Sequence, residues 1–187
     1  MQIDTIDSIN LVKKFCYENF QDKCPFISFE FFELLEKTRC TINSKGWIPE
    51  HIVIKKKNKV IGFIPNFRKL NSYGEFVFDQ IFENAFYQIG KDYFPKFLSA
   101  IPFTPVTRNN FLYYSENINN EELFNKLIIF LKNNNISSFH INFIDEVIST
   151  KLKKYFHQRI GIQYHWKNKK YKSFDDFLSH LKRRKKK

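Results

Sequence analysis

Residues 51–67 read HIVIKKKNKVIGFIPNF, which places two β-branched runs on either side of Lys-Lys-Asn-Lys. Such runs around a short polar turn predict a β-hairpin. Two amphipathic helices are predicted before it, over residues 8–20 and 28–38, with Ser8 and Ser28 as their N-caps. A chain that changes from helical spacing to strand runs in this way needs helices that cover a sheet.

Segments of helical and strand character alternate along the rest of the chain. Further helices are predicted over 80–90, 119–134, 146–158 and from 173 onward, and strands over 72–79, 111–115, 137–144 and 160–168. Pro95, Pro102 and Pro105 exclude a continuous helix over 93–106 and predict extended backbone or an edge strand. The pattern predicts an α/β or α+β domain with a mixed sheet. No internal repeat or flexible linker divides residues 1–187, so a single domain is expected.

Composition narrows the class of protein. With 187 residues, 43% of them hydrophobic, the chain is expected to bury a globular core. The N-terminus lacks the basic start and apolar centre of a signal peptide, and no apolar run reaches the ~20 residues that span a bilayer. A cytoplasmic protein without a transmembrane segment is therefore expected. Cys16, Cys24 and Cys40 form no CxxC pair and the histidines show no ligand spacing, which predicts reduced cysteines and no metal site.

The positive charge is concentrated at one end of the chain. The formal net charge is +12, yet residues 1–150 hold equal numbers of basic and acidic side chains. The whole excess lies in residues 151–187, where Asp175 and Asp176 are the acidic residues. A basic end on a neutral body indicates a local contact with a polyanion more than a protein dedicated to nucleic acid.

The stretch NSYGEFVFDQ holds the first candidate for chemistry. On a strand, Glu75 and Asp79 would project from one face with Tyr73 beside them. Carboxylates in such a row can accept a proton from an attacking amine, and a tyrosine hydroxyl can donate a hydrogen bond. The alternative is the solvated face of an ordinary half-buried strand.

The stretch DYFPKFLSAIPFTPVT is the second candidate. Its aromatic residues, its prolines and Lys96 would form a rigid apolar wall for an acyl chain or a peptide. The alternative is a proline-rich edge segment packed beneath the core.

The stretch RIGIQYHWKNKKY is the third candidate. His165 beside Trp166 could act as a base next to an aromatic wall, or it could be an ordinary structural histidine on a strand. No Gly-rich phosphate loop and no Gly-x-Ser-x-Gly elbow occurs in the chain, so neither nucleotide hydrolysis nor serine-hydrolase chemistry of that type is supported.

Five stretches together resemble one family. In order they are PFISFEFFELLE, GWIPEHIVI, SYGEFVFD, YFPKFLSAIPFTPVT and GIQYHWKNKKYKSFDDFLSHL. They are similar to the N-terminal half of the FemAB-like predicted N-acyltransferases, which belong to the GNAT superfamily and are linked to peptidoglycan biosynthesis/recognition. The resemblance implies a GNAT-like mixed, largely antiparallel sheet flanked by helices. It also implies transfer of an acyl or aminoacyl group to an amine-bearing acceptor.

The resemblance also extends to individual positions. The matched positions, which carry no established roles in the family, are Tyr73, Glu75, Asp79, Tyr93, Lys96, Thr104, His165, Trp166 and Asn168. We expect Glu75, Asp79 and Tyr73 to serve catalysis. The residues expected to bind substrate are Tyr93, Lys96, Phe103, Thr104, His165, Trp166 and Asn168.

The chain departs from the wider superfamily in two respects. The acyl donor implied by the resemblance is acyl-CoA or aminoacyl-tRNA. The usual pyrophosphate-binding loop of acyl-CoA enzymes is not recognisable in the sequence, where only RIGIQ is weakly similar to it. Members of the family also run to about twice this length and continue beyond a basic helix. We therefore expect a C-terminal half in the family architecture, with the end of this chain a natural terminus, a truncation or a frameshift.

Two readings other than catalysis stay open. One is a binding module whose basic C-terminus contacts tRNA or another polyanion through Lys182, Arg183, Arg184 and Lys185. The other is a truncated domain without activity of its own. The acyl donor, the acceptor and the oligomeric state are not determined by the residues.

Overall fold

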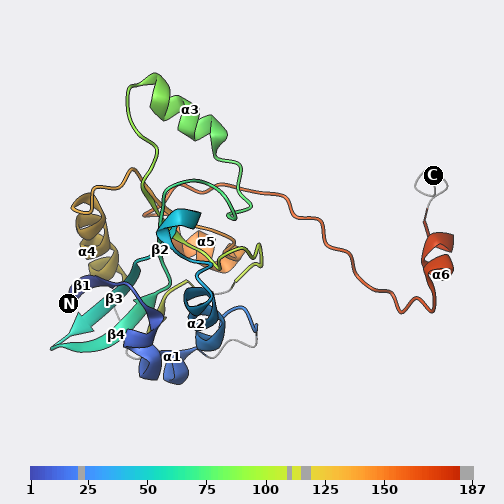
Figure 1. The fold of residues 1–187 in the computed structure, drawn as a ribbon, viewed down its shortest axis with the longest axis horizontal. Helices are drawn as coiled ribbons and strands as arrows, with labels where there is room; N and C mark the ends of the chain where they lie inside the picture. The colour runs from blue at the N-terminus through green and yellow to red at the C-terminus, as the bar shows by residue number, and fades with distance from the viewer. Residues whose placement is uncertain (21–23, 109–110, 115–118, 182–187) are drawn as a thin grey trace. The chain divides into compact units, whose positions relative to one another are not determined.

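The computed structural model describes residues 1–20, 24–108, 111–114 and 119–181 (Figure 1). The chain divides into two compact units, unit 1 over Met1–Phe156 and unit 2 over His157–Lys187. Whether the two form the single domain expected from the sequence stays a prediction. Among the described helices, none has both the length and the apolar content needed to cross a membrane.

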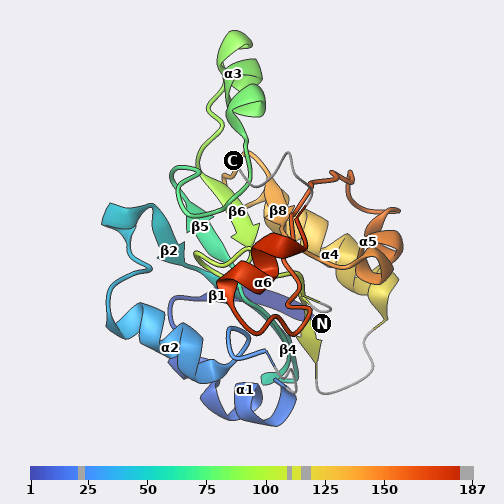
Figure 2. The same cartoon turned by 90° about the vertical axis from the view of Figure 1, so that its right-hand side faces the viewer.

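Unit 1 contains two four-stranded sheets (Figure 2). The first is antiparallel throughout, and the second pairs its last two strands in parallel. The first sheet has the order β1 (Gln2–Ile6), β3 (His51–Lys56), β4 (Lys59–Ile64), β7 (Tyr113–Tyr114), and the second has the order β2 (Trp47–Pro49), β5 (Phe67–Lys69), β6 (Lys96–Ser99), β8 (Phe139–Ile141). The predicted mixed α/β fold is confirmed, with the strands divided between two sheets. The GNAT-like topology stays a prediction.

The predicted hairpin is confirmed. β3 and β4 pair through a two-residue turn in which Lys57 has φ 49° and Asn58 has φ 63°. Two successive residues with positive φ are the mark of a turn whose twist matches the twist of the flanking strands. A register shift between Ile54 and Lys55 adds a local irregularity to the same hairpin.

The predicted helix starts are also confirmed where the caps were identified. The side chain of Ser8 accepts a hydrogen bond from the N–H of Asn10, and Ser28 accepts one from Phe31. The helical elements of the described chain are the 3₁₀ helices η1 (Ile9–Val12) and η2 (Asn43–Lys45) and the α-helices α1 (Lys13–Asn19), α2 (Phe29–Lys37), α3 (Gln80–Gln88), α4 (Asn120–Lys132), α5 (Glu146–Leu152) and α6 (Phe174–Ser179).

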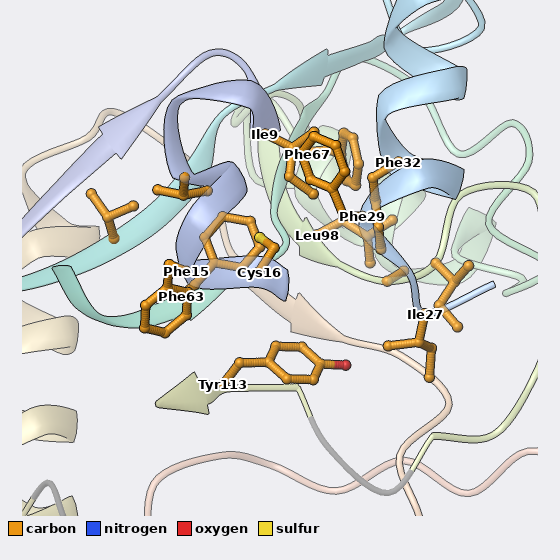
Figure 3. Packing of buried hydrophobic residues seen from close by; sticks show 14 of the residues in the cluster. Ile9, Phe15, Cys16, Ile27, Phe29, Phe32, Phe63, Phe67, Leu98 and Tyr113 are labelled. Atoms are coloured by element: carbon orange, nitrogen blue, oxygen red, sulfur yellow. The ribbon is translucent and has the colours of Figure 1, made fainter. Parts of the chain in front are cut away.

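Strand β3 lies between two hydrophobic clusters and contributes to both. Val53 packs in a cluster with residues of α1 and α2, whereas Ile52 and Ile54 pack in a second cluster with residues of α4 and α5. This alternation follows from the two-residue period of a strand. Figure 3 shows part of the first cluster, formed by Ile9, Phe15, Cys16, Ile27, Phe29, Phe32, Phe63, Phe67, Leu98 and Tyr113. Both faces of the first sheet are thus covered, which explains the unbroken apolar run of residues 52–54.

A partly buried carboxylate ties α2 to the first sheet. Glu36 accepts hydrogen bonds from the hydroxyl of Ser8 at 2.7 Å and from the N–H of Ile9 at 3.0 Å, and its Oε1 lies 3.1 Å from Nε2 of His51. The N–H of Asn66 donates to Nδ1 of the same imidazole, so Nε2 carries the proton and donates to Glu36. These bonds fix the start of η1 against the end of α2.

The strand predicted over 72–79 is wrong. Residues 73–74 form a turn, residue 75 lies in a bend and 76–79 are irregular, with Gly74 at φ 75° and Phe76 at φ 55°. Two residues in the left-handed region interrupt the pleat, because a strand requires negative φ throughout. The alternation of aromatic and polar residues here therefore comes from a loop whose carboxylates point inward, as described below.

The strand predicted over 160–168 is also wrong. No residue of 157–172 belongs to a strand, and Ile160 and Tyr164 are 94% and 96% exposed. A strand is stable only when its N–H and C=O groups pair with a neighbour, so alternation in the sequence does not suffice.

An edge position for the proline-rich segment is wrong as well. β6 lies inside the second sheet, between β5 and β8. Pro95 precedes β6, and Pro102 and Pro105 follow it, so none of them removes a hydrogen bond from the ladder. The extended backbone predicted for this segment is confirmed over β6. Strand β1 was not predicted from the sequence.

Candidate functional site

Two buried lysines face each other across the second sheet. Lys69 ends β5 and Lys96 begins β6, and the antiparallel register places them directly opposite each other. Both side chains are fully buried. Like charges in this position repel each other and lose their hydration, so strand pairing alone cannot account for them.

The loop that follows β5 supplies the compensating negative charges. It folds back over the strands so that Glu75 and Asp79, both fully buried, approach Lys96. Nζ of Lys96 lies 2.8 Å from Oε2 of Glu75 and 2.5 Å from Oδ2 of Asp79, while Oε1 of Glu75 lies 3.9 Å from Nζ of Lys69. The two lysines and two carboxylates balance in charge, and we call these four residues the ion cluster.

Tyr93 completes the ion cluster on the side of Asp79. Its hydroxyl donates to Oδ2 of Asp79 at 2.9 Å, and the ring is 5% exposed. The same ring makes an edge contact with His140, whose Nε2 lies 2.8 Å from the hydroxyl of Ser138. A ring from the segment before β6 and a histidine from β8 therefore meet beside the buried carboxylate.

Lys69 has a different environment from Lys96. Its Nζ lies 3.7 Å from the centre of the Trp47 ring and donates to the carbonyl of Tyr73 at 3.2 Å. Nε1 of Trp47 donates to the same carbonyl at 2.9 Å. Tyr73 thus contributes its backbone, while its side chain is 80% exposed. A catalytic hydroxyl at Tyr73 stays a prediction.

Burial and neighbouring charges shift the proton affinities of these groups. Burial raises the pKa of Glu75 despite the opposing effect of the lysines, and it lowers the pKa of Lys69 to about 7. For Asp79, burial raises the pKa, but the hydrogen bonds from Lys96 and Tyr93 outweigh burial and leave the pKa below its usual value. The ion cluster therefore holds a carboxylate whose ionised form is favoured, a carboxyl whose ionised form is disfavoured by burial, and an amine with a pKa of about 7.

The segment after β6 closes over Trp47. The Phe103 ring lies 5.1 Å from the Trp47 ring, and the hydroxyl of Thr104 donates to the carbonyl of Pro102. A Cβ at Gly74 would come within 2.6 Å of Phe103, so the turn before Glu75 fits only because residue 74 has no side chain. Of the residues predicted to bind substrate, Phe103 and Thr104 lie in this cover. Lys96 belongs to the ion cluster, and Tyr93 donates a hydrogen bond to it.

The other predicted substrate residues belong to unit 2. Nε2 of His165 lies 3.2 Å from the side-chain oxygen of Gln163, and the side-chain oxygen of Asn168 accepts from the N–H of Lys170 at 2.8 Å. Within this unit an open hollow of about 460 Å³ is lined by Trp166, Asn168, Tyr171, Ser173, Phe174 and Phe177. The hollow is lined mainly by aromatic rings.

Two further predictions concern the chain end and metal. The predicted polyanion contacts Lys182, Arg183, Arg184 and Lys185 lie outside the described residues. Over the described part of the chain, no three side chains of His, Cys, Asp or Glu come together as a metal site.

Sequence reasoning missed two members of this site. Lys69 lies in β5, outside every stretch quoted for the family resemblance, whereas Trp47 lies in β2 within GWIPEHIVI but was not predicted as a site residue. For Lys69, the only signal in the sequence was its place at the end of an apolar run. That Lys69 lies opposite Lys96 follows only from the strand register. The structure brings Glu75 and Asp79 to the same lysine, through a loop and not through the strand face that the sequence predicted, and their catalytic role stays a prediction.

Comparison with known proteins places the whole arrangement in one family. The FemAB-like family, described as peptidoglycan biosynthesis/recognition, matches residues 7–187, which include every member of the ion cluster. No curated protein and no solved structure matches the chain. The match covers nearly the full sequence. The chain therefore belongs to the FemAB-like family of peptidoglycan biosynthesis/recognition proteins.

Proposed function

We propose that the protein transfers an acyl or aminoacyl group to an amine of a peptidoglycan precursor peptide. The observation that carries this proposal is the buried ion cluster, in which a carboxyl with a raised pKa and an amine with a lowered pKa are held by a second ion pair. Perturbed pairs of this kind are typical of sites that move protons. The family match supplies the link to peptidoglycan.

The proposed reaction needs a proton acceptor and a fixed geometry. A neutral acceptor amine attacks the carbonyl of the acyl donor, an N–C bond forms, and the nitrogen loses a proton as the bond to the leaving group breaks. In this proposal the carboxylate of Glu75 accepts the proton of the nitrogen through a water molecule. Glu75 then passes this proton to the leaving oxygen or sulfur. Asp79 is a positioning residue in this proposal, because it fixes Lys96 beside Glu75.

Both donor classes implied by the resemblance remain in the proposal. Acyl-CoA would present a thioester and aminoacyl-tRNA an ester, and either carbonyl can react by the same proton transfer. The Phe103 and Trp47 rings form an apolar cover above Lys69 that suits the acyl portion of either donor.

The experiment is an assay of amide formation. The full chain is incubated with a lysine-containing cell-wall precursor peptide and, in separate reactions, with acyl-CoA or with charged tRNA, and the peptide mass is followed by mass spectrometry. We expect a mass increase with one donor class and a fall of about 10²-fold or more in rate for Glu75→Gln. Glu83→Gln, an exposed carboxylate on the following helix, is the matched control and retains the rate.

Two results would contradict the proposal. One is no product with any donor from a folded chain. The other is product formation by Glu75→Gln at the rate of the unsubstituted protein, which would remove Glu75 from the reaction while leaving the activity in place.

The charge of the C-terminal residues favours a second candidate function, binding of tRNA or another polyanion. Residues 151–187 carry the whole excess of positive charge, and the described lysines over 167–172 are exposed. Lysine–phosphate contacts predict a steep loss of affinity with salt and a further loss when 182–187 are deleted. Binding that is unaffected by both changes would exclude this candidate.

A further inference from the structure

Helix α3 stands apart from both sheets of unit 1. Figures 1 and 2 both show it at the end of two connecting segments, away from the other helices of the unit. Unlike α1, α2 and α5, it contains no buried residue. We call residues 76–92 the α3 arm.

The helix of this arm is amphipathic, and its apolar side is exposed. Apolar residues recur at helical spacing along it, so that they share one face. Ile81, Phe82, Ala85, Phe86 and Ile89 lie in α3 or directly after it, and together with Phe78, in the segment just before the helix, we call them the apolar stripe. Phe78 is 80% exposed, Ile81 77%, Ile89 66% and Phe82 46%. Near the C-terminal end of the stripe, the ring of Phe86 makes an edge contact with Tyr93.

Electrostatics restricts what can cover the stripe. Glu83 is the only charged residue between Gln80 and Gly90, and it lies on the face opposite the stripe together with Tyr87, which is 84% exposed. The two acids at the base of the arm, Glu75 and Asp79, are neutralised by buried lysines. Lys91 and Asp92, two exposed residues of opposite charge, follow the helix at the other end of the arm. The helix itself therefore presents an apolar surface rich in aromatic residues and almost without charge.

The area of the stripe decides between a second copy and a lipid surface. From the exposed fractions and the size of aromatic side chains, roughly 500 Å² of side-chain surface is available on each copy. A stable protein interface needs about 800 Å² on each partner. An interfacial helix needs only an apolar face that sinks roughly 5–10 Å into the headgroup boundary, with aromatic and aliphatic residues on that face. A protruding arm can do this without displacing the sheets.

We infer that the α3 arm binds the surface of a lipid bilayer by inserting its apolar stripe. Because the helix lacks cations, this contact is independent of anionic lipid. In that respect it differs from any contact made by the basic C-terminus, which depends on anionic headgroups and weakens with salt.

The experiment measures partition of the full chain onto vesicles of pure phosphatidylcholine at high salt, where the basic C-terminus contributes least. We expect binding of the unsubstituted protein and about tenfold or greater loss for Ile81→Gln combined with Ile89→Gln, since two apolar side chains no longer enter the bilayer. Tyr87→Gln, an equally exposed change on the opposite face, retains the affinity. All three positions are exposed, so the fold is retained, which circular dichroism checks.

A second measurement uses the unsubstituted chain alone. Hydrogen exchange of residues 76–92 is expected to slow when the same vesicles are added, while exchange in β3 is unchanged. No binding to phosphatidylcholine, equal binding by the double variant, or no protection of the arm would overturn the inference. A dimer in sedimentation experiments that the double variant abolishes would also overturn it, because a second copy would then cover the stripe.

Discussion

Lys96 is the residue on which the ion cluster depends. It contacts both carboxylates, whereas Lys69 lies 3.9 Å from one of them and otherwise donates to a backbone carbonyl. Removing one partner of a buried ion pair leaves an uncompensated charge, which costs far more than the net worth of the intact pair. The single positive charge at position 96 therefore keeps two negative charges inside the protein.

We predict that Lys96→Met lowers the free energy of unfolding by about 3–5 kcal/mol at neutral pH. Methionine fills much of the same volume but leaves Glu75 and Asp79 unpaired. Since protonation would neutralise them, the loss is expected to shrink as the pH falls. Urea denaturation at several pH values measures this, with the exposed Lys91→Met as the control. A change below about 1 kcal/mol would contradict a tightly coupled cluster.

Glu36 predicts a second pH dependence. Burial raises its pKa, but hydrogen bonds from His51, Ser8 and the N–H of Ile9 outweigh burial and lower it. A carboxyl with a lowered folded-state pKa stabilises the fold above its unfolded pKa of about 4.3, and the stabilisation is lost as the pH falls through the folded value. The stability gap between the unsubstituted protein and Glu36→Gln is therefore expected to narrow on acidification.

Urea midpoints from pH 7 downward measure this gap. Glu18→Gln, which removes an exposed carboxylate, is expected to show no comparable gap at any pH. A gap for Glu36→Gln that stays constant with pH would exclude an ionised Glu36 as the source of the stabilisation.

The loop over residues 70–79 is the element that assembles the candidate site. It leaves β5, turns at Gly74 with φ 75° and delivers Glu75 inward, with the Phe103 ring packed against the turn. The loop and the segment after β6 therefore hold each other in place. A side chain at position 74 would disturb both.

We predict that Gly74→Ala destabilises the protein by at least about 1 kcal/mol more than Gly90→Ala. Both glycines have left-handed φ, so alanine carries a similar backbone strain at each. A Cβ at position 90 meets nothing within 4 Å, whereas one at position 74 meets the Phe103 ring. Thermal unfolding of both variants isolates the contribution of the contact. Equal losses would show that Phe103 moves aside freely.

The elements differ in how far the sequence specifies them. The caps at Ser8 and Ser28, the Lys57–Asn58 turn and the left-handed Gly90 after α3 were predictable, because each depends on bonds within a few residues. The predictions of strands over 72–79 and 160–168 were wrong because alternation in one segment does not specify a second segment with which it can pair. The role of Lys69 was missed for the same reason, since it depends on the register that places Lys96 opposite it.

At the scale of the whole molecule, unit 1 holds both sheets and both hydrophobic clusters. Unit 2 holds α6 and a long segment, residues 157–172, that is exposed at nearly every position. We predict that trypsin cleaves first after Arg159 or after the exposed lysines over 167–172, and that the fragment containing unit 1 keeps its circular dichroism spectrum. Mass spectrometry of the early fragments tests this. First cleavage inside β3 or β4 would contradict it.

The opposed lysines also restrict the path by which such a sequence can change. A single replacement by an uncharged residue at position 69, 75, 79 or 96 passes through a protein with an unmatched buried charge, whereas replacing all four by apolar residues of similar volume removes the charges together. The protein with all four charged residues and the protein with four apolar residues are thus separated by single substitutions that each lower the stability of the fold. A descendant of this chain would keep the four residues as a set or lose them as a set.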